Sequence, residues 1–331
     1  ELAMDRTMRG EIDDPLEHEG HNSRYSALHD RETPESSELC GSCHDIVTPR
    51  GVHIERTYAE WQGSLYSDPN SVFGLSCSEC HMPGRDDLAA DYEGVKLRRV
   101  KDHSMPGVDK ALTDWPGKAD QAEKIAQILD TTLATTVCAS APGDPATFAV
   151  ISLDNVRAGH AFPSGASADR RAWVEVLAYD QDGELAYESG AVADGQALAD
   201  LQDTSVWAIH DEFVGAGGEL VHMFWDAVDY IEGGLPVPTT LDTSDPDYVD
   251  PHVLKTFVMG NFELSRIEVR VRMRAVGLDV IDDLIASGDL DPTYRDQIAT
   301  ETLAGSVTVW TPETATLSGN LLCVPAAVSA R

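Results

Sequence analysis

The sequence predicts an α+β protein in which a segment with sparse regular structure precedes an all-β sandwich with one helical insertion. Three observations lead to this prediction. Residues 39–118 are rich in glycine and proline, which interrupt helices and strands. Residues 119–136 carry an apolar stripe at helical spacing. From residue 137 onward, apolar and polar residues alternate in short runs, as they do in half-buried strands.

These patterns divide the chain into an N-terminal arm (1–38), a module that ends in a connector helix (39–136) and a sandwich domain (137–331). The arm is polar and has poor apolar periodicity, so we expect extended chain with short helical turns. Within the module, residues 57–66 place their aromatic side chains at spacings that suit one face of a short helix.

The strand signals in the last part of the chain are local and regular. Residues 267–274 alternate apolar and basic side chains, and residues 180–183 (DQDG) form a hairpin signal. Short antiparallel strands over about 190 residues are typical of an immunoglobulin-like sandwich. Residues 280–287 interrupt the strands with a helical pattern, and a second turn is expected near residues 292–299.

The module contains the pentapeptide CxxCH twice, at residues 40–44 (CGSCH) and 77–81 (CSECH). This pentapeptide is the attachment signature of a c-type haem. Two thiols three positions apart each form a thioether to one edge of a porphyrin, and the histidine that follows then places its imidazole on the iron. The sequence therefore predicts two covalently bound haem c groups, with His44 and His81 as proximal ligands. The predicted attachment residues are Cys40, Cys43, Cys77 and Cys80.

Two other uses of paired cysteines are possible. Two CxxC pairs can close a tetrahedral zinc site, and one CxxC can act as a redox dithiol. Neither requires a histidine directly after the second cysteine, and here that histidine occurs both times. The gap between the pairs is also longer than is usual in zinc ribbons.

The surroundings of both motifs resemble the repeated haem module of secreted multihaem c-type cytochromes. The resemblance is carried by residues 77–83 (CSECHMP) and 102–107 (DHSMPG), and also by residues 39–45 (LCGSCHD), 55–61 (ERTYAEW) and 159–165 (GHAFPSG). It implies electron transfer through haem outside the cytoplasm. Members of this family often carry more than the two haem motifs found here, so we expect a reduced form or one piece of a larger assembly.

Each iron needs a second axial ligand from elsewhere in the chain. His103 is the first choice, because the resemblance places an axial histidine at this position; Met105 nearby would instead raise the potential. His160 is second, because a glycine-flanked loop allows close approach to another group. His29 in the arm is the reserve, since its apolar neighbours could hold it against a porphyrin. Which donor serves which iron stays open.

Two cysteines, Cys138 and Cys323, lie outside the haem motifs. In an oxidising compartment such a pair is more often bonded than free. A disulfide between them would tie the start of the sandwich domain to its end. Two buried thiols are the alternative.

The chain carries 57 acidic and 24 basic residues, which gives a net charge of −33. This charge argues against nucleic acid or an anionic membrane as a partner. No apolar run approaches the length of a membrane span. Covalent haem is attached outside the cytoplasm, so we expect a periplasmic or extracellular protein.

Iron with both axial positions filled by histidine cannot bind a substrate, so the first expectation is a six-coordinate dihaem electron carrier, with the sandwich as a docking or assembly module. A dihaem reductase or peroxidase with one open iron is the alternative. A third possibility is a filament subunit whose arm lends a ligand to its neighbour. The expected partners are redox proteins, with self-assembly through the arm or the sandwich.

Overall fold

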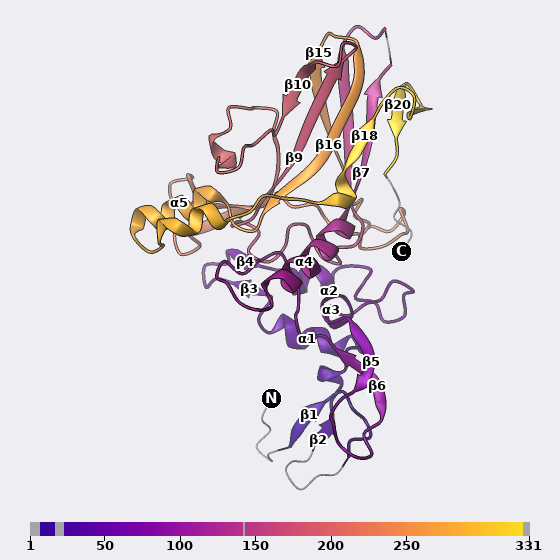
Figure 1. Ribbon diagram of the computed structural model, residues 1–331, viewed down its shortest axis with the longest axis vertical. Coiled ribbons are helices and arrows are strands. Elements are labelled where there is room, and N and C mark those ends of the chain that lie inside the picture. Colours follow the sequence, from indigo (N-terminus) through magenta and orange to yellow (C-terminus); the bar gives the residue numbers. More distant parts are fainter. Residues whose placement is uncertain (1–6, 17–22, 142, 327–331) are drawn as a thin grey trace.

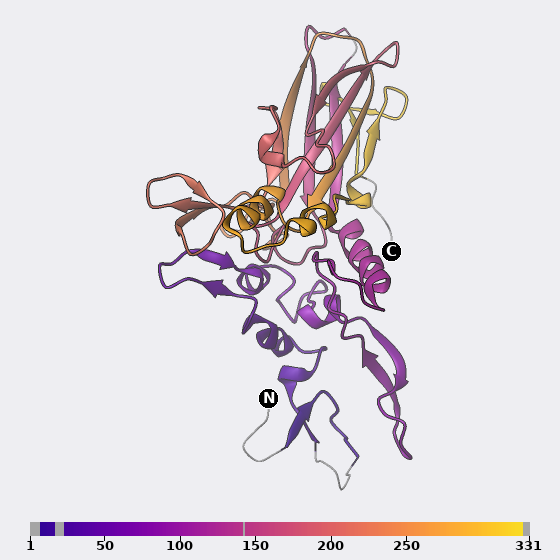
Figure 2. The same ribbon diagram turned by 60° about the vertical axis from the view of Figure 1, so that its left-hand side comes forward.

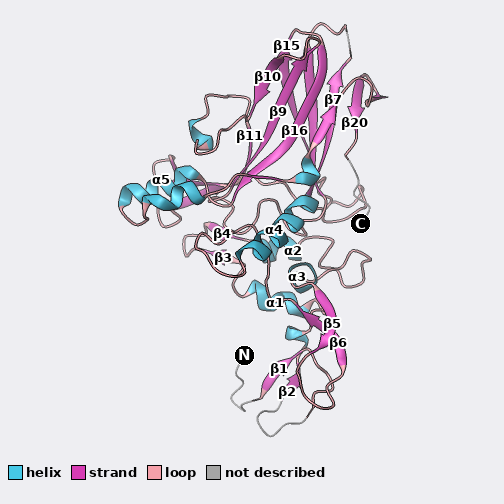
Figure 3. Ribbon diagram, viewed as in Figure 1, coloured by secondary structure: helices cyan, strands magenta, loops and turns pink. Residues whose placement is uncertain are grey.

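The structure is a computed structural model that describes residues 7–16, 23–141 and 143–326. It is elongated, with a domain of long strands at one end, short helices in the middle and two thin strand pairs at the other end (Figure 1). The long strands gather at one end, whereas most helices lie in the middle among short strands, as Figure 3 shows. The mixture of few helices and many strands confirms the α+β class.

The N-terminal arm forms the parallel pair β1 (Met8–Gly10) and β2 (Ser23–Tyr25), followed by the 3-10 turn η1 (Ala27–His29). Helix α1 (Glu35–Gly41) then begins four residues before the predicted start of the module. Pro34 before it has a helical φ of −61°, and acidic residues in the first turn suit a helix N-terminus. The other elements of the module are β3 (Ile46–Val47), β4 (His53–Glu55), α2 (Thr57–Gln62), α3 (Cys77–His81), β5 (Gly84–Leu88) and β6 (Leu97–Lys101).

Helix α3 coincides with the second CxxCH motif, and a capping box explains why so short a helix forms. Ser76 Oγ accepts a hydrogen bond from the backbone N of Glu79 (3.1 Å), and the Glu79 carboxylate accepts one from the backbone N of Ser76 (2.7 Å). Helix α2 ends at Gln62, earlier than the predicted residue 66, because Gly63 follows.

The connector helix α4 (Lys118–Thr132) runs directly into strand β7 (Leu133–Ser140). The predicted helix, 119–136, was therefore too long at its C-terminal end. Residues 131–137 are mostly threonine, leucine and valine, and this β-branched composition favours a strand. Ile125 and Leu129 bury one face of α4 against the sandwich core. Within the described chain, no helix combines the length and the apolar character that crossing a membrane would require.

Two antiparallel sheets form the sandwich and share one hydrophobic core. The five-stranded sheet has the order β15-β8-β7-β20-β19, and the other has the order β10-β9-β16-β17, with β11 beside β9 and β18 beside β16. The strands of the two sheets are β7, β8 (Thr147–Asn155), β9 (Arg171–Asp180), β10 (Leu185–Ser189), β11 (Trp207–Ile209), β15 (His252–Gly260), β16 (Leu264–Arg274), β17 (Glu301–Thr302), β18 (Thr308–Trp310), β19 (Thr316–Ser318) and β20 (Leu321–Val324). The immunoglobulin-like topology stays a prediction.

Segments inserted between the strands gather at the end of the sandwich that faces the module (Figure 2). The predicted helix is confirmed as α5 (Leu278–Ser287), and the turn after it as η3 (Pro292–Gln297). A separate three-stranded sheet consists of β12 (Glu212–Gly215), β13 (Leu220–Val221) and β14 (Ala227–Ile231). Two further short turns are η2 (Leu198–Asp200) and η4 (Ala304–Ser306).

The predicted disulfide between Cys138 and Cys323 is present. Cys138 in β7 lies directly opposite Cys323 in β20, in the middle of an antiparallel pairing. The bond therefore joins the first strand of the sandwich to its last and closes a sequence separation of 185 residues.

Replacing both cysteines, as Cys138→Ser with Cys323→Ser, should lower the free energy of unfolding by about 2–5 kcal/mol, because the unfolded chain gains conformational freedom. Denaturant unfolding of the oxidised protein and the double variant measures this difference. In the wild type, alkylation under denaturing conditions without reductant should leave both residues unmodified. Labelling of both would contradict the bond.

Candidate functional site

The two CxxCH motifs lie on helices that contact each other. The backbone N of Cys77, at the start of α3, donates a hydrogen bond to Ser37 Oγ of α1 (3.1 Å). The thiols of Cys40 and Cys77 are close enough to hydrogen-bond, which lowers the pKa of Cys77 to about 6 and raises that of Cys40. Two haems attached at these motifs would therefore have adjacent attachment points.

A single zinc site would require all four thiols of the motifs to converge. Across the described ranges, no group of three or more His, Cys, Asp or Glu side chains is arranged to hold a metal ion. Cys43 and Cys80, the second cysteine of each motif, are both exposed. The geometry therefore gives no support to the zinc alternative.

Large apolar side chains are exposed beside both motifs. Ile46 and Val47 follow the first motif, and Phe73 and Leu75 precede the second. Exposed aliphatic and aromatic groups of this kind mark a surface that normally has an apolar partner. They fit a large apolar macrocycle held next to each motif.

His81 lies beside His160, a residue 79 positions later in the chain. The two imidazole rings are nearly parallel, with an interplanar angle of 10° and a centroid separation of 6.5 Å. Nδ1 of His81 donates to the carbonyl of Pro106 (2.7 Å), and Nδ1 of His160 donates to the carbonyl of Ala161 (2.8 Å). This tautomer leaves Nε2 of each ring as a lone-pair donor, and no described group hydrogen-bonds to either Nε2. Such a backbone partner for the other nitrogen is typical of a metal-binding histidine.

The carboxylate of Glu60 in α2 holds the loop that carries His160. Glu60 Oε2 accepts hydrogen bonds from Ser164 Oγ (2.6 Å) and from the backbone N of Ala161 (3.2 Å). This is a contact between the module and the sandwich. It fixes the loop on both sides of the Phe162–Pro163 bond.

A second pair of contacts reinforces the same loop. Thr57, one turn before Glu60 on α2, hydrogen-bonds through its hydroxyl to Ser164 Oγ (2.7 Å) and accepts from the backbone N of Gly165 (3.0 Å). Because Thr57 and Glu60 are three residues apart on a helix, they present their side chains on one face.

The sandwich holds the other side of the loop. Asn155, the last residue of β8, donates from Nδ2 to the carbonyl of His160 (2.7 Å) and accepts at Oδ1 from the backbone N of Ala158 (3.2 Å). Phe162 exchanges two backbone hydrogen bonds with Leu235 (3.0 and 2.6 Å). His160 is thus fixed by its own domain and by α2 together.

Burial changes the pKa of both polar groups at this contact. Desolvation raises the pKa of Glu60 above its usual range, although the hydrogen bonds from Ser164 and Ala161 oppose the shift. Desolvation also lowers the pKa of His160 to about 4. His160 is therefore neutral at physiological pH, which is the state that can donate a lone pair.

His44, the histidine of the first motif, has a different environment. Its side chain is 60% exposed, and its Nδ1 lies 2.7 Å from Glu55 Oε1. A carboxylate on one ring nitrogen orients the imidazole and makes the other nitrogen a stronger ligand. No described histidine ring stacks on His44 in the way that His160 stacks on His81.

His103 and His29, the other two predicted donors, lie near each other on either side of Lys101. Nδ1 of His103 lies 3.2 Å from the carbonyl of Lys101, and Lys101 Nζ donates to the carbonyl of His29 (3.0 Å). His103 and Met105 are exposed, whereas His29 is half-buried in η1, which contacts α1. Their roles as ligands stay predictions.

Three further histidines, all in the sandwich part of the chain, have protein partners. Nδ1 of His210 donates to the carbonyl of Asp211 (2.8 Å). His222 is ion-paired with Asp279 and Asp283, which raises its pKa. His252 is hydrogen-bonded to Asp154 (2.5 Å).

Sequence reasoning missed the residues that support the histidines, namely Glu55, Glu60 and the carbonyl of Pro106. Glu55 and Glu60 belong to the stretch 55–61, in which Glu55 precedes the short aromatic helix α2 and Glu60 lies in it. Two acids beside an aromatic face next to a haem motif could have indicated a role there. A backbone carbonyl leaves no signal in the sequence.

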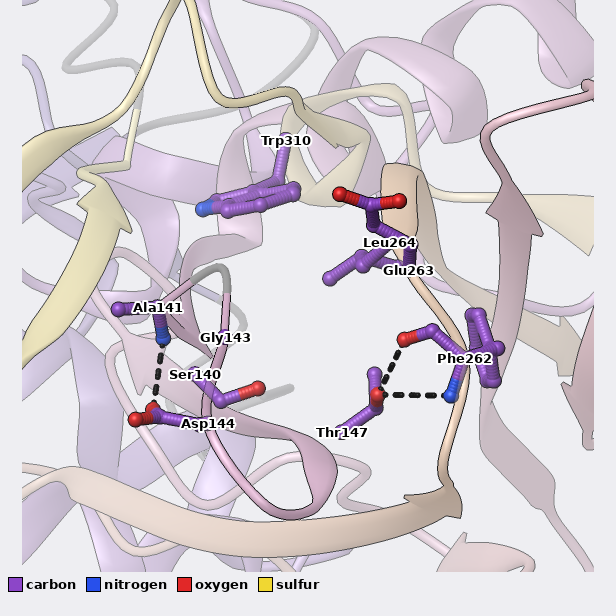
Figure 4. A pocket seen from close by; sticks show the side chains of 9 residues that line it. All are labelled: Ser140, Ala141, Gly143, Asp144, Thr147, Phe262, Glu263, Leu264 and Trp310. Carbon is purple, nitrogen blue, oxygen red and sulfur yellow. Dashed lines mark hydrogen bonds between the residues drawn. The ribbon is translucent and has the colours of Figure 1, made fainter.

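A small cavity at the opposite end of the sandwich has no part in this site. It has a volume of about 30 Å³, enough for a water molecule. Ser140, Thr147, Phe262 and Trp310 are among its lining residues, and Thr147 Oγ1 donates to the carbonyl of Phe262 (2.6 Å; Figure 4).

Comparison with known proteins finds a likeness only at the level of structure. No protein-family model matches the chain, and no curated protein matches it. The chain is similar to the crystal structure of a penta-haem cytochrome c552 from Thermochromatium tepidum, with a TM-score of 0.52 and 16% sequence identity. The likeness covers 90% of this chain and 62% of that cytochrome. At this identity it shows that the two proteins share a fold.

Glu60→Gln should remove a pH-dependent part of the stability. Because the pKa of Glu60 is raised, the folded state binds its proton more tightly than the unfolded state. The free energy of unfolding therefore falls as pH rises from the ordinary glutamate pKa through the raised one. Glutamine resembles the protonated form, so the stability of the wild type relative to the variant should fall as pH rises above the ordinary glutamate pKa of about 4.

Denaturant unfolding at a series of pH values measures this difference. Glu93→Gln, at an exposed position in the loop between β5 and β6, is the matched control and should give a difference that does not change with pH. If the difference in the free energy of unfolding between the wild type and Glu60→Gln also does not change with pH, the carboxylate is not desolvated at the domain contact.

Proposed function

We propose that this chain transfers electrons outside the cytoplasm through two covalently bound haem c groups with histidine on both sides of the iron. The observation that carries the proposal is the parallel pair of His81 and His160. When bound, each haem supplies a one-electron couple on its iron. The protein supplies the attachment cysteines, the axial imidazoles and the apolar surroundings.

The separation of the two rings supports ligation of one metal from opposite sides. A metal–imidazole bond is about 2 Å long, and the ring centre lies roughly 1 Å beyond the nitrogen, so two opposed rings would have centroids roughly 6 Å apart. His81 and His160 are 6.5 Å apart, and both have Nδ1 on a backbone carbonyl. We therefore assign His160 as the distal ligand of the iron at His81.

The iron at His44 would take its distal ligand from His103 or His29. His29 has support from its place in η1, which contacts the helix that carries Cys40. His103 has support from the family resemblance. Glu55 would hold His44 in the tautomer that binds iron through Nε2.

Histidine ligation of both irons favours a carrier over an enzyme. An open iron is needed for a substrate, and two imidazoles on one iron leave no open position. The polar groups around His160, namely Glu60, Thr57 and Ser164, are engaged in holding the loop. They support a positioning role rather than acid–base catalysis.

The disulfide between β7 and β20 supports an oxidising compartment, periplasmic or extracellular. The chain spans about 62% of the length of the cytochrome that it resembles in fold, so a place in a larger multihaem assembly is part of the proposal. Redox proteins are the proposed partners, with self-assembly through the arm or the sandwich.

Denaturing mass spectrometry should find the polypeptide with two haem masses, because each CxxCH motif attaches one haem. Replacing both cysteines of the second motif, as Cys77→Ser with Cys80→Ser, should leave one. A zinc ion in place of haem, or one haem in the wild type, would refute the proposal.

His160→Ala should open the iron at His81, because its distal imidazole is lost. One haem should then become high-spin in the absorption spectrum and bind carbon monoxide, while the other stays low-spin. The matched control is His252→Ala, an exposed histidine on β15, which should change neither haem. His103→Ala should open the other iron if His103 serves His44.

The two outcomes that count against this assignment are distinct. Unchanged spectra after His160→Ala would remove His160 from the ligand set. A high-spin haem already present in the wild type would instead favour the dihaem reductase or peroxidase.

A further inference from the structure

Arg31 is buried against the second attachment helix, with 8% of its surface exposed. Its carbonyl accepts a hydrogen bond from Ser76 Oγ (2.6 Å), and its Nη2 donates to the carbonyl of Glu79 (3.4 Å). Ser76 caps α3 and Glu79 belongs to it. Both the main chain and the side chain of Arg31 are therefore fixed on this helix.

Two nitrogens of the Arg31 guanidinium lack a partner. Nε and Nη1 are buried, and neither has a hydrogen bond to any described residue. A guanidinium remains charged and has five N–H donors, so burying some of them unpaired is unfavourable. Glu32 Oε1 lies 3.5 Å from Nε, but the Glu32 side chain is 62% exposed, so water screens this ion pair. The site lacks an acceptor for Nη1.

A second guanidinium lies at the same place. A Cβ built on Gly84, the first residue of β5, would lie 2.7 Å from Arg31 Nη1 and 2.7 Å from Arg99 Nε. Only glycine leaves room for both groups here. Arg99 is exposed, and it forms no ion pair with any residue that the structure describes. Two positive groups on either side of one glycine repel each other unless an anion compensates them.

The acidic residues nearby are mostly engaged elsewhere. Arg31, Arg98 and Arg99 line a cavity of about 170 Å³ together with Glu11, Asp30 and Glu32, and Arg98 is ion-paired with Asp14. Glu11 is paired with Lys101 (2.8 Å), and Asp30 accepts hydrogen bonds from the Tyr25 hydroxyl and from the backbone N of Glu32. Among the described residues, Arg99 therefore has no acidic partner, and Arg31 has only the largely exposed Glu32.

We propose that Arg31 and Arg99 bind a carboxylate, namely a propionate of one of the haems attached at α1 and α3; this inference rests on the proposed function. A guanidinium donates charge-assisted hydrogen bonds to a carboxylate, and the N–H groups of Arg31 Nη1 are free to do so. The haem brings its own carboxylates to this part of the molecule. The contact between α1 and α3 places both attachment points near Arg31.

The test is a potentiometric titration of the haem-loaded full chain, followed by absorption, for the wild type, Arg31→Met and Arg99→Met. Reduction adds an electron, so a positive charge next to the haem favours the reduced form. Arg31→Met should therefore lower the midpoint potential of one haem and leave the other unchanged. A tenfold change in the ratio of reduced to oxidised haem at fixed potential corresponds to about 59 mV. Arg99→Met should lower the same midpoint by less, because water screens Arg99.

Arg85→Met, in the same hairpin as Gly84, is the matched control. Arg85 is an exposed arginine paired with Asp87, and its loss should move neither midpoint. Arg31→Lys keeps the charge but loses the second hydrogen bond. Its midpoint potential should therefore lie between those of Arg31→Met and the wild type. If Arg31→Met does not fold, Arg99→Met and the lysine variant still decide the question.

Three results would overturn the inference: unchanged midpoints in the Arg31 and Arg99 variants, an equal shift in Arg85→Met, or a wild-type midpoint that moves with added acetate at constant ionic strength. The last result would mean that the site takes its anion from solution. Failure of the proposed function is separate, because it would appear as missing haem masses or as an open iron in the wild type. If the wild type has two low-spin haems and the arginine variants have unchanged midpoint potentials, this inference alone is rejected.

Discussion

The arrangement of this protein depends on a buried polar contact between its two domains. Glu60 and Thr57 on α2 bind the loop at Ser164, and Asn155 at the end of β8 binds the carbonyl of His160. Each hydrogen bond satisfies a group that burial would otherwise leave unpaired. Because the loop is held from both domains, the His160 ring stays parallel to His81.

This contact gives the sandwich a role beyond docking. A β-rich domain that follows a cytochrome module in sequence could be an independent appendage. Here α4 continues into β7 without an intervening residue, and its buried face belongs to the sandwich core. The domains are therefore joined by the continuous connection from α4 to β7 and by the loop at residues 159–165. In the proposed arrangement, the sandwich supplies one of the four axial histidines.

The sequence predicted the features of the chain whose signals are local. The CxxCH motifs, the disulfide and the helical insertion at α5 all follow from short patterns or from counting cysteines. The glycine-flanked loop around His160 pointed to close approach, but its partner, His81, could not be identified, because that pairing depends on how two domains pack. The end of α4 was misplaced because threonine is tolerated in helices, and the sheet decides the outcome at residues 133–136.

Supporting groups were harder to predict than ligands. The carbonyl of Pro106 beside His81 carries no sequence signal, and Glu55 beside His44 looks like any charged residue before a helix. His103 and His29 show the converse limit, since a strong motif and a plausible neighbourhood do not by themselves bring a side chain to a particular iron. Tertiary contacts, rather than residue type, distinguish these histidines.

The position of His160 on a sandwich loop has a thermodynamic consequence. If docking of the two domains strengthens an iron–imidazole bond, then that bond must strengthen docking by the same free energy. A change that favours the bond in one oxidation state would also favour the docked form in that state. The domain interface would then respond to electron transfer. Conversely, mechanical or chemical stress on the sandwich would change the reduction potential of one haem.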